Sequence, residues 1–298
     1  METILEVKNL SKHYKTSGVL EKLSLTINKG DIYGFVGKNG AGKTTLIRII
    51  SGLVDEDEGE FSLFGVSSKT SEIVNARRKV CAMVESPAIY PDLSAKDNLK
   101  MQCIITRQDE SCIDELLSFV NLSHTGKKLA KDFSLGMRQR LGIAMALVSK
   151  PELMLLDEPI NGLDPEGIKQ VRELLLKMHK EKNVTILISS HILTELSLFA
   201  TRYGFIDKGH IVKEATLDEI IKETSESCYV ESDNTEKALS ILNKLGYHAE
   251  LQNTGIKVDE EIDLMKVCRE FEKNKINLTK HIKSSVDLES YFMNLIGD

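Results

Sequence analysis

The stretch GKNGAGKTT at residues 37–45 decides the fold. An apolar run, Ile32–Val36, precedes it, and a helix is predicted from about residue 44 to 51. The residues that satisfy the phosphate-binding pattern G-x-x-x-x-G-K-[ST] are Gly37, Gly42, Lys43 and Thr44. Between a strand and a helix, such glycines let backbone N–H groups converge on phosphate oxygens, helped by the helix N-terminus. The stretch therefore predicts a nucleoside triphosphate site.

Two side chains of this loop have expected roles in nucleotide binding. Lys43 is expected to reach the β- and γ-phosphates, and the Thr44 hydroxyl is expected to bind Mg²⁺. Further nucleotide contacts are expected from Asn39, Gly40 and Thr45. A phosphate loop alone does not separate GTPases, kinases, helicases and transport ATPases. A GTPase would also carry Asn-Lys-x-Asp, and the nearest stretch, residues 243–246, reads Asn-Lys-Leu-Gly and lacks the acid.

A pair of acids ends a second apolar run, LMLLDEP at residues 153–159. Successive side chains on a strand point in opposite directions, so two adjacent acids are expected to do different jobs. Asp157 suits the Mg²⁺ shell, because Mg²⁺ prefers hard oxygen ligands. Glu158 is expected to face the γ-phosphate and to act as the general base that polarises the attacking water.

Composition and charge exclude several classes of protein. The 298-residue chain has a net charge of −6, which gives no support to a general nucleic-acid-binding role. Its five cysteines are scattered and form no CxxC pair, which argues against a zinc ribbon or a disulfide framework. The N-terminus METILEVKNL is not expected to be a signal peptide. No stretch approaches the roughly 20 apolar residues that cross a bilayer, so work at a membrane would require docking on a separate membrane protein.

The pattern of elements divides the chain into two predicted domains. Strands and helices alternate through residues 1–222, which predicts a nucleotide-binding domain with a parallel α/β core. Thr216-Leu217-Asp218-Glu219 matches a capping box and is expected to open a helix. Residues 223–298 predict a small accessory α+β domain. Its expected strands lie near residues 228–231, 249–252, 256–258 and 278–282, and its expected helices near 235–245, 263–274 and 287–296.

A further motif, FSLGMRQR at residues 133–140, precedes the acid pair by about twenty residues. It resembles the signature Leu-Ser-Gly-Gly-Gln of ATP-binding-cassette (ABC) ATPases. The order of motifs is also similar to that family, because NGLD at 161–164 and Ser190-His191 follow the acid pair. The resemblance covers residues 1 to about 220 closely and the tail loosely. It implies a P-loop ABC-ATPase fold, with a RecA-like core, an antiparallel β subdomain and a helical signature subdomain, plus the small C-terminal α+β unit.

The resemblance also implies residue roles and an activity. Tyr14 looks like the aromatic residue that stacks on adenine, and Asp164 matches the loop that links two sites across a dimer. His191 matches the switch histidine that hydrogen-bonds the γ-phosphate. The implied enzyme is a transporter ATPase that converts ATP and water to ADP and phosphate, with ATP and Mg²⁺ as ligands.

The signature motif implies that each site is shared between two chains. Ser134 and Gly136 match positions that contact the γ-phosphate held by the opposite subunit, whereas Leu135 and Met137 depart from the consensus Gly and Gln. The implied partners are therefore a second ATPase subunit, in a homodimer or a paired assembly, and separate transmembrane permease subunits. The implied location is the cytoplasmic face of the cell membrane, and no nucleic acid partner is implied.

One acid distinguishes this chain within the family. Glu85, in MVESPAIYPDL at residues 83–93, follows the predicted strand 80–84 where family members usually carry Gln. A Glu here resembles the ATPases of bacitracin- and lantibiotic-type peptide exporters. The resemblance implies that Glu85 touches Mg²⁺ or the attacking water and couples ATP hydrolysis to the membrane partner, while Ile89, Tyr90 and Pro91 either face that partner or pack within the helical lobe.

Other readings remain open. The exported substrate could be another drug, a lipid or a polysaccharide. A soluble ABC ATPase that clamps ribosomes or DNA is the rival from another class. Ribosomal clamps usually carry two cassettes and repair proteins a long inserted coiled coil, whereas this chain has one uninterrupted cassette. The sequence therefore favours the ATPase of a peptide exporter that serves resistance or self-immunity.

Overall fold

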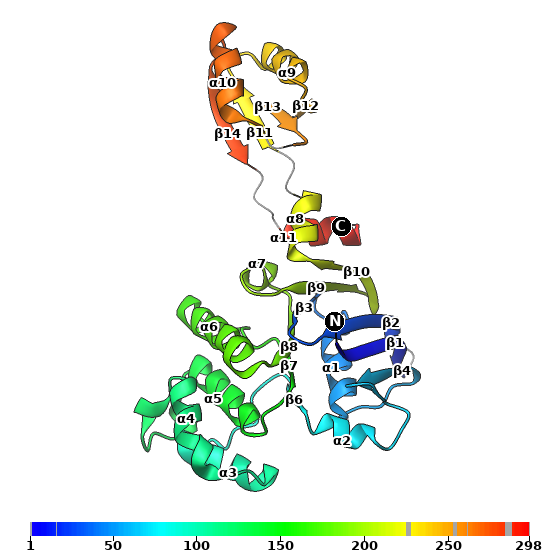
Figure 1. Cartoon of the computed structure of the whole chain (residues 1–298), viewed down its shortest axis with the longest axis vertical. Coiled ribbons are helices and arrows are strands. Elements are labelled where there is room, and N and C mark those ends of the chain that lie inside the picture. Colours follow the sequence, from blue (N-terminus) through cyan, green and yellow to red (C-terminus); the bar gives the residue numbers. More distant parts are fainter. Residues whose placement is uncertain are drawn as a thin grey trace. The chain divides into compact units, whose positions relative to one another are not determined.

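In the computed structural model the chain forms two compact units, Met1–Ala215 and Thr216–Asp298 (Figure 1). The structure describes residues 2–15, 17–224, 228–252, 255–260, 262–283 and 288–297. The boundary expected after residue 222 falls inside helix α8 (Leu217–Thr224), which contacts assign to the second unit. No helix among the described residues is long and apolar enough to cross a bilayer.

A six-stranded sheet forms the centre of the first unit, in the order β10-β9-β3-β8-β7-β6. The strands are β3 (Ile32–Val36), β6 (Val80–Met83), β7 (Leu153–Asp157), β8 (Thr185–Ser190), β9 (Arg202–Asp207) and β10 (His210–Thr216). β3 pairs in parallel with β8 and β9, and β7 pairs in parallel with β6 and β8. The predicted parallel core is therefore confirmed, and it brings the carboxyl ends of β3, β7 and β8 to one edge of the sheet.

A second, antiparallel sheet packs over the first helix. Its order is β2-β1-β4-β5, formed by β1 (Thr3–Tyr14), β2 (Ser17–Asn28), β4 (Glu58–Leu63) and β5 (Val66–Ser67). Helix α1 (Lys43–Ser51) places Leu46 and Ile49 in one apolar core with Val7 of this sheet and with Phe35 and Leu155 of the parallel sheet. Because both sheets bury their apolar faces against α1, the helix that follows the phosphate loop is held on two sides. Helix α2 (Ile73–Arg77) leads from this region to β6.

Helices make up most of residues 94–150. They are α3 (Ala95–Thr106), α4 (Ile113–Phe119) and α5 (Leu135–Val148), with short 3₁₀ turns at Glu110–Cys112, Ser123–Thr125 and Ala130–Asp132. Helix α6 (Pro165–Lys182) leads from β7 to β8, and α7 (Leu193–Leu196) follows β8. Figure 1 shows α3, α4, α5 and α6 gathered beside the sheet, on the side of β6 and away from the antiparallel sheet. This group is the predicted helical subdomain.

The second unit has its own sheet and core. Strands β11 (Cys228–Ser232), β12 (Ala249–Gln252), β13 (Gly255–Val258) and β14 (Leu278–Lys283) form a sheet in the order β12-β13-β11-β14, with antiparallel neighbours. Helices α9 (Thr235–Lys244) and α10 (Leu264–Lys273) pack on it through Leu242, Val267 and Phe271. Together these elements give a split β-α-β-β-α-β arrangement.

Both ends of this unit are helical. The capping box that opens α8 is present, because Glu219 Oε2 accepts from the Thr216 backbone N–H at 2.7 Å and Thr216 Oγ1 accepts from the Glu219 N–H at 3.2 Å. At the other end, α11 (Leu288–Ile296) donates a hydrogen bond from Tyr291 Oη to Glu223 Oε2 at 2.8 Å. Residues 225–227, 253–254, 261, 284–287 and 298 of the predicted accessory domain lie outside the described residues.

Candidate active site

The phosphate loop connects β3 to α1 at the carboxyl edge of the parallel sheet. Gly40 and Gly42 have φ of 83° and 112°, backbone angles that residues other than glycine rarely adopt. Gly37 is required for another reason, because an added Cβ would lie 2.5 Å from the Ile206 carbonyl oxygen of β9. The loop therefore passes so close to the sheet that its glycines are fixed by the fold as well as by any bound phosphate.

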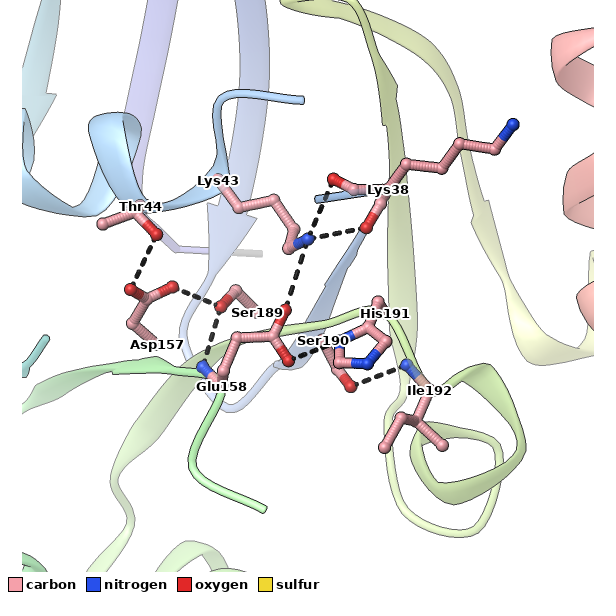
Figure 2. A network of polar contacts seen from close by, with 10 residues as sticks. Lys38, Lys43, Thr44, Asp157, Glu158, Ser189, Ser190, His191 and Ile192 are labelled. Atoms are coloured by element: carbon pink, nitrogen blue, oxygen red, sulfur yellow. Dashed lines mark hydrogen bonds and ion pairs between the residues drawn. The ribbon is translucent and has the colours of Figure 1, made fainter. Parts of the chain in front are cut away.

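Lys43 is folded back into the loop. Its side chain is 5% exposed, and Nζ donates to the carbonyl oxygens of Gly37 at 2.6 Å and Lys38 at 3.2 Å (Figure 2). Glu158 Oε1 lies 3.3 Å from the same nitrogen. The ammonium group is thus held at the centre of the loop, next to the acid that is expected to act as the base.

Asp157 is almost completely buried, at 2% exposure, and both of its oxygens accept hydrogen bonds. Thr44 Oγ1 donates to Oδ2 at 2.8 Å, and Ser189 Oγ donates to Oδ1 at 2.7 Å (Figure 2). Asp157 and Ser189 are paired residues of the parallel strands β7 and β8. Strand register therefore places a hydroxyl beside the carboxylate. The sequence analysis missed Ser189, although its signal was present as a polar residue that ends an apolar strand, like Asp157.

Glu158 leaves the strand, so the expected reason for its direction was wrong. β7 ends at Asp157, and Glu158 adopts a left-handed conformation with φ of 48°. Its backbone N–H donates to Ser189 Oγ at 3.0 Å, which fixes the turn. The two acids do separate, but a left-handed turn after the strand separates them, and strand alternation does not.

The side chain of Glu158 returns toward the phosphate loop. Oε2 lies 2.9 Å from His191 Nδ1, which follows β8 (Figure 2). Oε1 is buried, its ion-pair partner is Lys43 Nζ at 3.3 Å, and no described residue donates a hydrogen bond to it. Because the ammonium contact at 3.3 Å leaves its hydrogen-bonding capacity unused, this oxygen can accept a proton or a hydrogen bond from a bound molecule.

A cavity of about 170 Å³ lies beside these groups. It is lined by Val19, Asn39, Gly40, Gly42, Lys43, Thr44, Thr45 and Glu158. All of the predicted loop contacts except Gly37 line it, together with the predicted base. Val19 of β2 was not predicted, because nothing in the sequence places that strand over the loop.

The oxygen donors near the cavity fit a magnesium ion. Thr44 offers a hydroxyl and Asp157 a carboxylate, which are hard ligands of the type that Mg²⁺ prefers. No group of three or more His, Cys, Asp or Glu side chains among the described residues is arranged to hold a metal. Mg²⁺ does not need such a cage, because it usually takes one or two carboxylates and completes its shell with water and substrate phosphates.

Glu85 lies outside this network. Its carboxylate forms an ion pair with the guanidinium of Arg48, on α1, and the side chain is 67% exposed. Glu85 also has a positive φ, 61°. Its expected contact with Mg²⁺ or water stays a prediction. The Arg48 partner was missed, although Arg48 follows Thr44 by four residues and so lies on the same face of the helix.

The remaining predicted residues lie apart from the network. Tyr14 ends β1 with 42% exposure, and Lys12 Nζ lies 5.7 Å from its ring centroid. Ser134 caps α5 by accepting from the Met137 N–H at 3.3 Å. Asp164 caps α6 by accepting from the Gly167 N–H at 3.0 Å. Their roles toward adenine and the opposite subunit stay predictions.

Gly136 lies in the first turn of α5, close to the start of α6. An added Cβ would meet Gly167 Cα at 3.7 Å and Leu163 Cδ2 at 3.8 Å. The signature residues therefore lie beside the loop that carries Asp164, within one chain.

Known proteins are similar to this chain in sequence. Residues 20–161 match the family model described as ABC transporter. The bacitracin transport ATP-binding protein BcrA of Bacillus licheniformis is 38% identical over 100% of this chain and 98% of its own length. The lantibiotic transport ATP-binding protein SrtF of Streptococcus pyogenes is 41% identical over 72% of this chain and 92% of its own.

A solved structure agrees with the fold. The dimeric post-hydrolysis ATP-binding cassette MJ0796 bound to ADP and phosphate has a TM-score of 0.65 and 25% identity, covering 72% of this chain and 99% of its own. The chain belongs to the ATP-binding subunits of ABC transporters, and its reaction is ATP hydrolysis.

Proposed function

We propose that two copies of this chain hydrolyse ATP with Mg²⁺ and thereby power the export of antimicrobial peptides through separate membrane subunits. The observation that carries the substrate class is the full-length similarity to a bacitracin transport protein, which includes the second unit. The Glu at position 85 supports the same branch. Work at the cytoplasmic face of the membrane, on a permease, completes the proposal.

The chemistry rests on Oε1 of Glu158, which accepts no hydrogen bond from a described residue. His191 Nδ1 holds Oε2, which leaves Oε1 beside the cavity to accept a proton from the attacking water. Lys43 supplies positive charge to the transferred phosphate, and Asp157 orients the Thr44 hydroxyl. A bound Mg²⁺, held by Thr44 and Asp157, would neutralise charge on the phosphate oxygens.

The second copy completes the site in this proposal. Ser134 and Gly136 stand at the N-terminus of a 14-residue helix, α5, where backbone N–H groups and the helix dipole favour an anion. A γ-phosphate held by the opposite copy would meet them, with Asp164 beside the junction. The dimeric state of the related cassette supports this arrangement.

A groove offers a place for the permease. It has a volume of about 440 Å³ and is lined by β6, by residues 86–88 and by α5, with exposed Leu53 at its side. Burial raises the pKa of the Cys81 thiol, in the groove wall, to about 11, so this side chain stays uncharged at neutral pH. An apolar segment of a membrane subunit would fit such a surface. Tyr90, two residues beyond Ala88, is also exposed, in line with the proposed partner contact.

A deletion strain tests the proposed function. Loss of this chain is expected to sensitise cells to cyclic and lanthionine peptides, measured as the growth-inhibiting concentration of each peptide in a panel. Expression of the wild-type chain is expected to restore resistance, whereas the Glu158→Gln variant is not. Unchanged growth against all of the peptides, with sensitivity to a different class of drug, would refute the peptide assignment.

Tyr14 gives a test of the expected adenine contact. Tyr14→Ala is expected to raise KM for ATP by about 2- to 10-fold, the range for loss of one aromatic stack, with kcat little changed. The ring is exposed, so the substitution leaves the core intact. Tyr14→Phe serves as the control and is expected to keep the wild-type KM. Equal KM values for all three proteins in a steady-state assay would exclude the stacking role.

A further inference from the structure

The segment around Glu85 is attached to α1 through its charge. The Glu85 carboxylate pairs with Arg48, whose side chain is 37% exposed. Thr44 and Arg48 are four residues apart on α1 and therefore lie on one face, about one turn from each other. The ion pair thus holds Glu85 one helical turn beyond the hydroxyl that contacts Asp157.

The same segment is attached to α5 by close packing. At Gly142 of α5, an added Cβ would lie 2.6 Å from Pro87 Cβ and 3.1 Å from Met83 Sδ. Pro87 therefore rests against the helix backbone itself, in a notch that only glycine leaves open. α5 is the helix that begins directly after Ser134. A displacement of Pro87 would therefore shift the helix that bears the signature residues.

Between these two attachments the segment forms part of the groove wall. Ser86, Pro87 and Ala88 line the groove, directly after Glu85. Glu85 itself holds a left-handed backbone conformation, which costs free energy for residues other than glycine and asparagine. A strained residue at the joint is suited to a change of conformation, provided that a specific contact holds it in place.

We propose that Arg48 is a positioning residue that holds Glu85, so that occupation of the groove reaches the phosphate-loop helix through the ion pair and the signature helix through Pro87 and Gly142. This inference rests on the proposed function, because it assumes that the groove receives a permease segment.

Hydrogen exchange on the full-length chain without nucleotide tests the ion pair. The reporters are the amides of Ile89 and Tyr90, which donate to Pro87 O and to Asn98 Oδ1. Arg48→Gln is expected to speed their exchange about two- to five-fold, as for loss of an exposed ion pair. Glu85→Gln is expected to have the same effect, and the double variant no more than either single variant.

Three comparisons separate positioning from general loosening. Arg48→Lys keeps the charge and is expected to restore most of the protection. In about 1 M salt, where charges are screened within roughly 3 Å, the wild type is expected to approach the Arg48→Gln rate. Lys79→Gln, which breaks the surface pair of Lys79 with Glu152, is expected to leave the two reporters unchanged. Additive effects of the two single variants, or equal effects of Lys79→Gln, would overturn the proposal.

Coupling between the groove and the nucleotide site is tested separately, by the peptide resistance of cells. Arg48→Gln is expected to lower peptide resistance of cells at least several-fold, while the purified chain keeps KM and kcat for ATP within about two-fold. Full resistance despite faster exchange would overturn the coupling role. Because exchange is measured without substrate or permease, its result stands apart from that of the deletion strain, which tests the proposed function alone.

Discussion

Glu158→Gln is expected to lower kcat for ATP hydrolysis by about 10²- to 10⁴-fold while ATP still binds. Glutamine has the same shape and offers an oxygen to His191 Nδ1, which lies 2.9 Å from Oε2 in the structure. It cannot take up a proton at neutral pH, so the attacking water loses its base. Phosphate release in steady state and fluorescent ATP titration of the purified full-length chain measure the two quantities.

A matched control excludes a simple effect of charge. Glu152→Gln removes one carboxylate from the surface, where Glu152 pairs with Lys79, and is expected to leave kcat within about two-fold. Turnover of Glu158→Gln at the wild-type rate would show that another group is the base. Loss of ATP binding in this variant would instead assign Glu158 to the support of Lys43.

The second large effect is expected on ATP-driven pairing of the chain. In the Glu158→Gln background, ATP is expected to accumulate in the site and to hold two copies together, as seen by a shift in sedimentation or gel filtration. Addition of Gly136→Asp is expected to abolish that shift. The new carboxylate would face the γ-phosphate of the opposite copy, where two like charges repel in a partly desolvated site.

The structure explains why this variant should remain folded. At Gly136 an added Cβ meets its neighbours only at 3.7 Å or more, which is ordinary packing distance. An acid in the first turn of α5 also agrees with the helix dipole. Gly136→Asn adds similar bulk without charge and is expected to impair pairing less. A dimer of undiminished stability in the Gly136→Asp variant would contradict the shared site.

Local patterns in the sequence predicted most of the fold. The apolar runs and the glycine loop placed β3, α1 and β7 to within one or two residues. The capping box at Thr216 was also correct. The sequence did not predict the order of strands, because hydrogen-bonded neighbours such as β3 and β8 are more than a hundred residues apart. For the same reason it did not reveal the split arrangement of the second unit.

The sequence predicted those residues of the candidate site that belong to a recognisable motif. Lys43, Thr44, Asp157 and Glu158 do meet, because their strands end at one edge of the sheet. Ser189 enters through strand register, which a single sequence does not specify. The turn of Glu158 depends on a left-handed backbone angle, and no residue type in LMLLDEP predicts that angle. The contacts expected for Tyr14, Glu85 and the signature residues stay predictions.

The position of α1 between two sheets has a consequence for how the protein unfolds. Leu46 and Ile49 belong to the apolar core that joins both sheets, and the phosphate loop leads directly into this helix. The phosphate loop is therefore expected to unfold together with the two sheets, without a melting transition of its own. Heat or denaturant should erase nucleotide affinity and tertiary structure of the first unit in one cooperative step, and saturating ATP should raise the midpoint of that step by mass action.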